Sequence, residues 1–218
     1  MIETQTGSNA AATPLAIDDG VLMERAAHGD REAFASLVDR HKDDLVRYLT
    51  RLSGSFEGGE ELAQETFLRL WSSAPRYRHH GKLLAYLFRI GANQLRSQQR
   101  RQGRFMALLP TWRASQTETE PGPAGGLLAR EAQDQVQWAI AQLPLEYREA
   151  LVLFELEGWS YQRIAEHLAC REGTVKSRIF RARRKLRETL TPYWDRVQSP
   201  LAPAAAGWTE GAWHGDES

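Results

Sequence analysis

The chain has 218 residues, of which 42% are hydrophobic and 26% are charged, so it is large enough to bury one ordinary core or two small ones. Its single cysteine, Cys170, excludes a disulfide framework and any metal site that needs several cysteines. The sequence has no apolar run of membrane-spanning length, and its first residues lack the segments of a signal peptide. We therefore expect a cytoplasmic protein that does not insert into a membrane.

The formal net charge of zero comes from 28 basic and 28 acidic residues, and these are segregated along the chain. Twelve acidic and six basic residues lie between Asp18 and Glu65, whereas the segment from Thr66 to Thr117 holds ten basic residues and no acid. A second basic segment, KSRIFRARRKLR, begins at Lys176 and also lacks acids. One acidic and two basic surfaces suggest two kinds of partner, although solvated helix faces would give the same pattern.

Hydrophobic periodicity and capping residues predict four helices in the first half of the chain, after a disordered segment over residues 1–17. These helices are expected at Asp18–His28, Asp30–Gly54, Glu60–Trp71 and Lys82–Arg101. The prolines and paired glycines of residues 105–126 then predict a flexible linker.

Four more helices are predicted beyond the linker, and Pro192 is expected to end the last of them. They span Leu127–Pro144, Leu145–Glu157, Tyr161–Leu168 and Glu172–Leu190. Because no segment alternates like a strand, the predicted fold is all-α, with two small helical domains at 18–104 and 127–190 joined by the flexible linker.

The helices Tyr161–Leu168 and Glu172–Leu190, separated by a short turn, have the dimensions of a helix-turn-helix. Ala165 is small where the two helices would cross, and Cys170 is most simply a small buried apolar residue. The C-terminal domain is therefore predicted to be a helix-turn-helix domain.

The last predicted helix has an apolar face and a basic face when it is projected at about 100° per residue. The apolar stripe consists of Val175, Ile179, Ala182 and Leu186. The opposite face carries Ser177, Phe180, Arg181 and Arg184, with Lys176 and Arg187 on one flank. A merely solvated face does not need a phenylalanine, whereas a helix in the major groove uses arginine for guanine edges and phenylalanine for a thymine methyl group. This pattern favours duplex DNA binding.

The helix at Lys82–Arg101 has a second basic face, and the basic and aromatic loop RYRHHGK precedes it. The outward residues are Lys82, Arg89, Asn93, Arg96 and Arg100, with Tyr86 beside them. Cations along a backbone with aromatic faces nearby are what single-stranded DNA binding requires. The adjacent histidines of the loop, His79 and His80, point apart and are a poor metal pair.

The helix at Glu60–Trp71 carries Leu68 and Trp71 on the same face as carboxylates, which is typical of a protein-docking surface. Periodicity alone leaves open that Trp71 is an ordinary core residue.

Two blocks of the chain resemble the extracytoplasmic function (ECF) group of bacterial RNA polymerase sigma factors. The blocks EELAQETFLRLW (60–71) and LLAYLFRIGANQLRSQQRR (83–101) are similar to sigma region two. The block LPLEYREALVLFELEGWSYQRIAEHLACREGTVKSRIFRARRKLR (143–187) is similar to region four, although the family usually has glycine near Ala169. The resemblance implies a factor that binds core polymerase, directs it to specific promoters and helps melt the −10 region.

The resemblance also implies a role for each surface. The residues expected to dock on the clamp helices of the largest polymerase subunit are Glu61, Gln64, Glu65, Leu68 and Trp71. The residues expected to hold the melted −10 strand are Tyr77, Arg78, Lys82, Tyr86, Arg89, Asn93 and Arg96, and the loop at 76–82 would receive one flipped base. The residues expected to read the −35 duplex are Thr174, Lys176, Ser177, Phe180, Arg181 and Arg184. Further implied partners are the flap of the second-largest subunit and, by family habit, an inhibitory anti-sigma factor.

Two other functions are compatible with parts of the sequence. A stand-alone helix-turn-helix regulator would share the C-terminal domain but would not need an exposed docking face or a second basic surface. A nuclease would have to use Glu57, Glu60, Glu61 and Glu65 as a metal cluster, yet no base or nucleophile accompanies them. We therefore expect no enzyme activity, no metal and no cofactor. The tail at 191–218, with Trp208 and Trp213, is expected to be disordered; a partner-binding or autoinhibitory element is the alternative.

Overall fold

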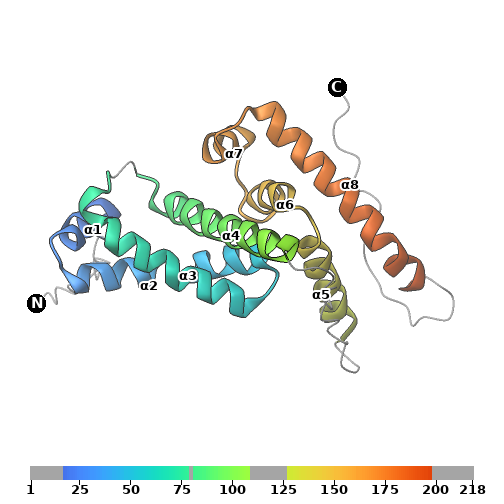
Figure 1. The fold of residues 1–218 in the computed structure, drawn as a ribbon, viewed down its shortest axis with the longest axis horizontal. Helices are drawn as coiled ribbons and strands as arrows, with labels where there is room; N and C mark the ends of the chain where they lie inside the picture. The colour runs from blue at the N-terminus through green and yellow to red at the C-terminus, as the bar shows by residue number, and fades with distance from the viewer. Residues whose placement is uncertain (1–16, 79–80, 109–126, 198–218) are drawn as a thin grey trace, which may run out of the picture.

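The computed structural model describes residues 17–78, 81–108 and 127–197, and no strand occurs in these segments (Figure 1). The N-terminal unit contains α1 (Asp19–Ala27), α2 (Arg31–Ser53), α3 (Phe56–Ser73), the 3-10 turn η1 (Ala74–Arg76) and α4 (Leu83–Leu108). The C-terminal unit contains α5 (Leu127–Ala141), α6 (Leu145–Leu151), the π-helical turn η2 (Val152–Leu156), α7 (Tyr161–Leu168) and α8 (Glu172–Val197). The predicted all-α fold is confirmed. The expectations for residues 1–16, for the linker at 109–126 and for the tail beyond 197 fall outside the described residues.

Side-chain caps explain where four of the described helices, α1, α2, α3 and α7, begin. Asp18 accepts a hydrogen bond from the Gly20 amide at 2.7 Å, and Asp30 accepts from the amides of the first turn of α2. Ser160 accepts from the Arg163 amide at 3.2 Å and so starts α7. Each cap satisfies an amide that has no partner within its own helix.

The helix α3 begins at Phe56, four residues before the predicted start. Ser55 caps it by accepting from the Gly58 amide at 3.1 Å. The glycines at 58 and 59 therefore lie inside the helix, although glycine is a poor helix former. Gly59 has a packing reason, because a Cβ there would lie 2.6 Å from the backbone nitrogen of Thr50. Only glycine allows α3 to approach α2 this closely.

The prediction that Pro192 ends the last helix is wrong, because α8 continues to Val197. A proline inside a helix removes one backbone hydrogen bond. Here Pro192 is exposed, and the hydroxyl of Thr191 donates to the carbonyl of Arg187 at 2.7 Å. Tyr193, the next residue, is buried, and its burial offsets the loss.

The helix α4 also extends past its predicted end, to Leu108. The added residues are mostly good helix formers, and the one glycine among them is not enough to stop the helix. The first residues of the predicted linker are therefore helical.

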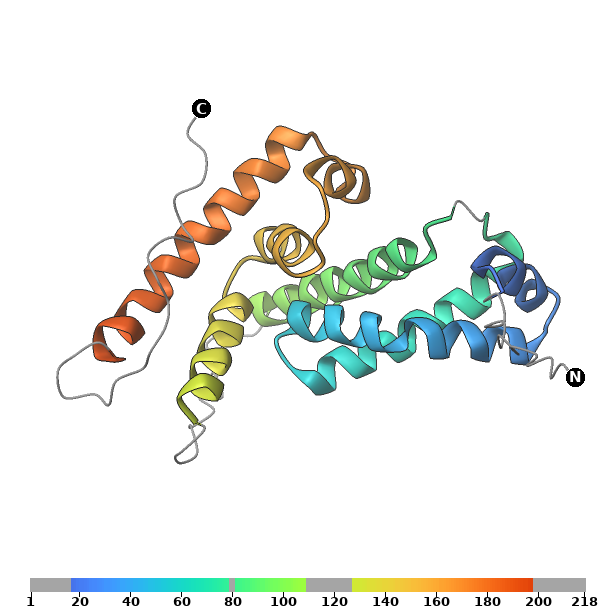
Figure 2. The same cartoon turned by 180° about the vertical axis from the view of Figure 1, so that it is seen from behind.

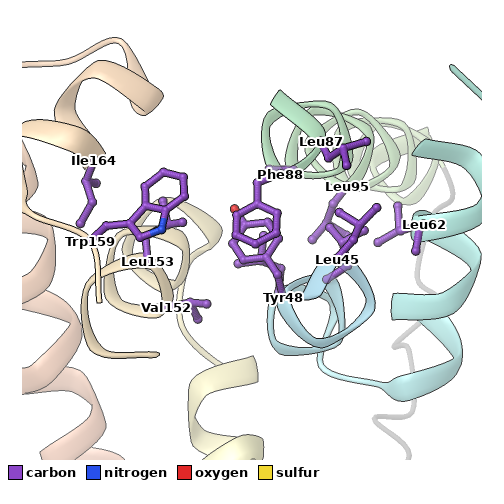
Figure 3. Packing of buried hydrophobic residues seen from close by; sticks show 14 of the residues in the cluster. Leu45, Tyr48, Leu62, Leu87, Phe88, Leu95, Val152, Leu153, Trp159 and Ile164 are labelled. Carbon is purple, nitrogen blue, oxygen red and sulfur yellow. The ribbon is translucent and has the colours of Figure 1, made fainter. Parts of the chain in front are cut away.

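The two units pack against each other. The sequence predicted two domains joined by a flexible linker, and such a linker does not by itself imply a contact between them. In both views α6 lies between α4 and α8 (Figures 1 and 2). Trp159 of the C-terminal unit faces the stacked rings of Phe88 and Tyr48 (Figure 3). The ring centroids of Tyr48 and Phe88 are 3.9 Å apart, and those of Phe88 and Trp159 are 5.9 Å apart. One continuous hydrophobic core therefore crosses the boundary between the units, which we call the seam.

A buried arginine of the C-terminal unit caps a helix of the N-terminal unit at the seam. The Arg148 guanidinium donates to the carbonyl of Leu52, near the end of α2, and to the carbonyls of Ala141 and Leu143 in its own unit. The last carbonyls of a helix have no partner within the helix. Arg148 therefore ties the end of α2 to the C-terminal unit, and its burial lowers its pKa below the usual arginine value.

The turn of the helix-turn-helix contains a strained residue. Ala169 ends α7 with φ of 51°, in the left-handed region, where its amide hydrogen bonds to the carbonyls of Ala165 and Glu166. A side chain with a Cβ is disfavoured in this conformation by roughly 1–2 kcal/mol. Glycine, which has no Cβ, would adopt this conformation without the strain.

We expect Ala169→Gly to raise the free energy of unfolding by about 0.5–1 kcal/mol, because it relieves this strain at some entropic cost in the unfolded chain. Urea unfolding followed by circular dichroism measures the change. Ala132→Gly, inside α5, is the matched control and should lower the stability by about 0.5–1 kcal/mol. A loss of stability in both variants would contradict the strain at Ala169.

We expect Gly59→Ala to lower the free energy of unfolding by about 1–3 kcal/mol, because the added methyl group overlaps the backbone at Thr50. Gly173→Ala is the control, since a Cβ at Gly173 in α8 meets nothing within 4 Å. The control should keep or raise the stability. Equal behaviour of the two variants in the same urea experiment would show that the contact between α2 and α3 tolerates the methyl group.

Candidate polymerase and nucleic-acid interfaces

The residues predicted to contact polymerase all lie on α3. They are Glu61, Gln64, Glu65, Leu68 and Trp71. The side chain of Leu68 is 61% exposed, and Glu61 and Gln64 also face solvent. The opposite side of the helix, which includes Leu62 and Leu70, is buried in the core. An exposed leucine among polar side chains is suited to burial against a protein partner.

Two of these residues also have partners within the chain. Trp71 is half-buried, and its ring packs edge-on against Phe34 of α2 with centroids 4.9 Å apart. Glu65 accepts a hydrogen bond from Arg69 Nε at 3.1 Å. Trp71 is therefore neither an ordinary core residue nor fully exposed, and its contact with polymerase stays a prediction.

Gln94 connects α3 to α4, and sequence reasoning missed it. Its side-chain amide is buried. The amide nitrogen donates to the carbonyl of Leu62 at 3.2 Å, and the amide oxygen accepts from Arg69 Nε at 2.9 Å. A polar residue at an inward-facing position of a predicted helix was the available signal. Gln94 fixes α3 against α4, because burying an amide without these bonds would cost free energy.

The residues predicted to hold the −10 strand lie on α4 and on the segment before it. The rings of Tyr77 and Tyr86 lie side by side, with centroids 5.1 Å apart and planes at 47°. The Arg89 guanidinium lies over the Tyr86 ring at 5.4 Å. Tyr77 is partly buried, and this burial raises its pKa above the ordinary tyrosine value. Arg78 is exposed, whereas residues 79–80 of the same loop fall outside the described residues. The structure thus places two aromatic rings and a cation together, a combination that is typical of single-strand binding surfaces.

Other members of this set contact the C-terminal unit. Arg96 donates to the Asn93 side chain at 2.6 Å and also to the Glu149 carboxylate of α6. Lys82 Nζ lies 3.5 Å from a carboxylate oxygen of Glu166 in α7. We call this surface the strand face, after the DNA strand that it is predicted to hold, and it consists of Lys82, Tyr86, Arg89, Asn93 and Arg96. Two of its cations are engaged across the seam.

Glu149 is only 1% exposed, and its surroundings come from both units. Besides Arg96, the Tyr48 hydroxyl of α2 donates to it at 3.4 Å. Burial raises the Glu149 pKa above its ordinary value, and the nearby Arg96 charge opposes that rise. The pKa of Tyr48 is raised well above its ordinary value by burial and by the Glu149 charge.

His167 of α7 lies beside this carboxylate but is not ion-paired with it. Its Nε2 is 3.8 Å from Glu149 and has no hydrogen-bond partner. Burial, helped by the positive charges of nearby arginines, lowers the His167 pKa to about 4. The imidazole is therefore neutral at pH 7, and Arg96 is the cation that balances Glu149.

The residues predicted to read the −35 duplex lie on one side of α8. They are Thr174, Lys176, Ser177, Phe180, Arg181 and Arg184, and all but the half-buried Thr174 are exposed. Phe180 is 68% exposed, while Val175 and Ile179 on the opposite side are buried. An exposed aromatic ring among arginines is thus held outward by the burial of the other face.

Neighbouring side chains orient several cations of this face. Arg181 donates to the Tyr147 hydroxyl at 3.4 Å. Lys176 Nζ lies 5.4 Å from the centre of the Tyr161 ring, and Arg184 lies 3.7 Å from Glu188 in the next turn. These contacts limit how far the long side chains sample other rotamers, which lowers the entropy lost on binding.

In the segments that the structure describes, no three histidine, cysteine or acidic side chains gather closely enough to share a metal ion. Glu57, Glu60 and Glu61 are exposed, and Glu65 is bound to Arg69. None of the described helices is both long and apolar enough to cross a bilayer.

Two families of protein segments match this chain. "Sigma-70 region 2" matches residues 37–105, which include α3 and the strand face, and "Sigma-70, region 4" matches residues 133–186, which include the helix-turn-helix. The first match lies on helices α2 to α4, and the second lies on helices α5 to α8.

Whole proteins are similar over most of the chain. The ECF RNA polymerase sigma factor SigE of Mycolicibacterium smegmatis is 37% identical over 171 residues, which is 77% of this chain and 66% of that protein. The ECF RNA polymerase sigma-E factor of Haemophilus influenzae is 32% identical over 184 residues, which is 81% of this chain and 97% of that protein. A sigma factor RpoE solved in complex with the anti-sigma factor NepR from Bartonella quintana has a TM-score of 0.60 and 28% identity, over 73% of this chain and 98% of that one. The chain belongs to the ECF group of RNA polymerase sigma factors, which direct core RNA polymerase to promoters.

Proposed function

We propose that three separate surfaces of this chain divide the work of promoter recognition. The exposed side of α3 docks on the clamp helices of the largest polymerase subunit. The strand face, with Tyr77 and Arg78, holds the melted −10 strand, and the outer side of α8 reads the −35 duplex. The C-terminal unit also contacts the flap of the second-largest subunit.

The observation that carries this proposal is the exposure of apolar side chains on helices whose other faces are buried. Leu68 on α3 and Phe180 on α8 are each more than 60% exposed. A stand-alone regulator would account for the face around Phe180. It would not account for Leu68, or for a second face that combines cations with tyrosine rings. These two features favour a factor that acts together with polymerase.

The proposed function needs no chemistry from this chain. Its surfaces position polymerase and DNA, and the synthesis of RNA belongs to the core enzyme. Because bacterial transcription takes place in the cytoplasm, we place the protein there. The similar sigma factor from Bartonella quintana was solved with an anti-sigma factor, and we propose that a protein of this kind also inhibits the present chain.

The direct test is to add the purified chain to sigma-free core polymerase with a genomic DNA template and to map the RNA 5′ ends. We expect discrete start sites that share two upstream motifs at a fixed spacing. Binding to core polymerase without any discrete start sites would contradict the proposed roles in DNA recognition. Absence of both core binding and transcripts would favour the stand-alone regulator.

We expect Arg181→Ala to weaken holoenzyme binding to the −35 duplex by about 1–3 kcal/mol and to relax the preference for one base pair, because a base-edge contact is lost. Competition binding with a set of single-substitution −35 duplexes measures both effects. Arg183→Ala is the matched control, because Arg183 lies outside the set of residues predicted to read the duplex. Its Nε donates a hydrogen bond to Glu155 at 2.9 Å. An equal loss of affinity for every duplex would show that Arg181 contacts only phosphate.

We expect Gln64→Ala combined with Leu68→Ala to reduce the affinity for core polymerase about 100-fold, because an exposed anchor and its neighbour are removed from the docking surface. Titration of fluorescently labelled protein with core polymerase measures the affinity. Glu60→Ala, exposed on the same helix but outside the predicted docking set, should bind within about twofold of the unchanged chain. Unchanged affinity of the double variant would remove α3 from the polymerase interface.

A further inference from the structure

A cleft of about 680 Å³ lies between α4 and the C-terminal unit, and arginines dominate its charged lining. Its volume is in the range of sites that hold small molecules. The charged residues of the lining are the arginines Arg89, Arg96, Arg100 and Arg178 and the glutamates Glu146 and Glu149. Because the arginines outnumber the glutamates, the cleft attracts a small anion more than a cation.

Two of these arginines, Arg89 and Arg100, have no acidic partner among the described residues. The Arg89 guanidinium contacts an aromatic ring, and Arg100 donates to the Ser97 hydroxyl at 3.4 Å. Both are exposed residues of α4. Arg96, which lies between them, is instead balanced by Glu149. The charges of Arg89 and Arg100 are therefore available to a ligand in the cleft.

The opposite wall of the cleft adds a cation from the C-terminal unit. Arg178 of α8 is partly buried, and its guanidinium lies 3.2 Å from a carboxylate oxygen of the more exposed Glu146. His167 also lines the cleft, and its buried Nε2 has no hydrogen-bond partner. Burial, and after it the charges of Arg89 and Arg96, lower the His167 pKa to about 4. The positive potential of α4 therefore extends across the cleft to this wall.

The spacing of the unpaired cations indicates the length of the anion. A rise of 1.5 Å per residue separates the Cα atoms of Arg89 and Arg100 by about 16 Å along one face of α4. A single phosphate would reach both arginines only if their side chains extended fully toward each other, which costs rotamer entropy. A linear chain of phosphates contacts both without this restriction.

We propose that this cleft binds a linear chain of two or more phosphates, either free or as part of a nucleotide, with arginines of both units as its ligands. A guanidinium suits this role, because it donates two parallel hydrogen bonds to a phosphate. Arg89 and Arg100 hold the anion along α4, and Arg178 exchanges Glu146 for a phosphate oxygen. The site goes beyond the surfaces assigned above, since Arg100 and Arg178 belong to none of the three sets of residues predicted to contact polymerase or DNA. Arg89 is shared with the strand face.

The test is isothermal titration calorimetry of the full chain with inorganic phosphate, pyrophosphate and tripolyphosphate at constant ionic strength. ATP is a fourth ligand, and its comparison with tripolyphosphate isolates the contribution of the nucleoside. The variants Arg100→Gln and Arg178→Gln each remove one cation, one from each wall. The matched controls are Arg101→Gln, an exposed neighbour outside the cleft lining, and Arg183→Gln, which is paired with Glu155 on α8's own unit. Thermal unfolding checks that each variant is folded.

We expect tripolyphosphate to bind more tightly than pyrophosphate, and inorganic phosphate to bind weakest, because only the longer anions span the arginines. Arg100→Gln and Arg178→Gln should each weaken tripolyphosphate binding about tenfold, since each loses a charged hydrogen bond. The two controls should bind within about twofold of the unchanged chain, because their charges lie outside the cleft and are screened by salt. Tighter binding of ATP than of tripolyphosphate would identify a nucleotide as the ligand, and equal binding would identify the phosphate chain alone.

Three results would overturn the inference. The first is the absence of binding by both tripolyphosphate and ATP. The second is an equal loss of affinity in the controls, which would reduce the effect to a general attraction between a basic surface and an anion. The third is unchanged affinity in Arg178→Gln, which would remove the C-terminal unit from the site. None of these results bears on promoter recognition, because the transcription assay that tests the proposed function does not depend on this ligand.

Discussion

The buried carboxylate of Glu149 is the constraint on which the arrangement of the two units depends. It lies in a nearly dry position at the seam, where an unbalanced charge would be strongly unfavourable. Arg96 of α4 balances the charge and Tyr48 of α2 adds a hydrogen bond. The position of α6 is therefore fixed relative to two helices of the other unit. Arg148, the preceding residue, adds a second polar tie by capping the end of α2.

The apolar contacts around this charge set the spacing of the units. Tyr48, Phe88 and Trp159 form a stacked series that passes from α2 through α4 into the C-terminal unit (Figure 3). Large aromatic rings bury much surface and prefer defined mutual orientations. The contact between the two units thus combines apolar packing that favours compactness with charges that specify how the surfaces meet.

The interfaces assigned to polymerase and DNA follow one physical pattern. Each is the outward side of a helix whose inward side is held in the core, as Leu62 and Leu70 hold α3 and Val175 and Ile179 hold α8. The exposed side chains are therefore presented from a rigid support, which limits the entropy lost on binding. The strand face differs from the other two, because Lys82 and Arg96 on it pair with acids of the C-terminal unit.

The sequence by itself determined the helical fold, most helix starts and the division of each helix into a core side and a binding side. The two sides of a helix follow a repeat of three to four residues, and a helix start depends on a capping residue beside it. Both signals are therefore present in the local sequence. It misplaced the end of α8, because whether a helix tolerates Pro192 depends on the burial of Tyr193. It also gave no sign that Arg96 and Glu149 meet, or that Gln94 joins two helices. Arg96 and Glu149 are 53 residues apart, and Tyr48 and Glu149 are 101 apart. Only the tertiary structure decided these contacts, because the burial of a charge and the identity of its partner arise when distant helices pack together.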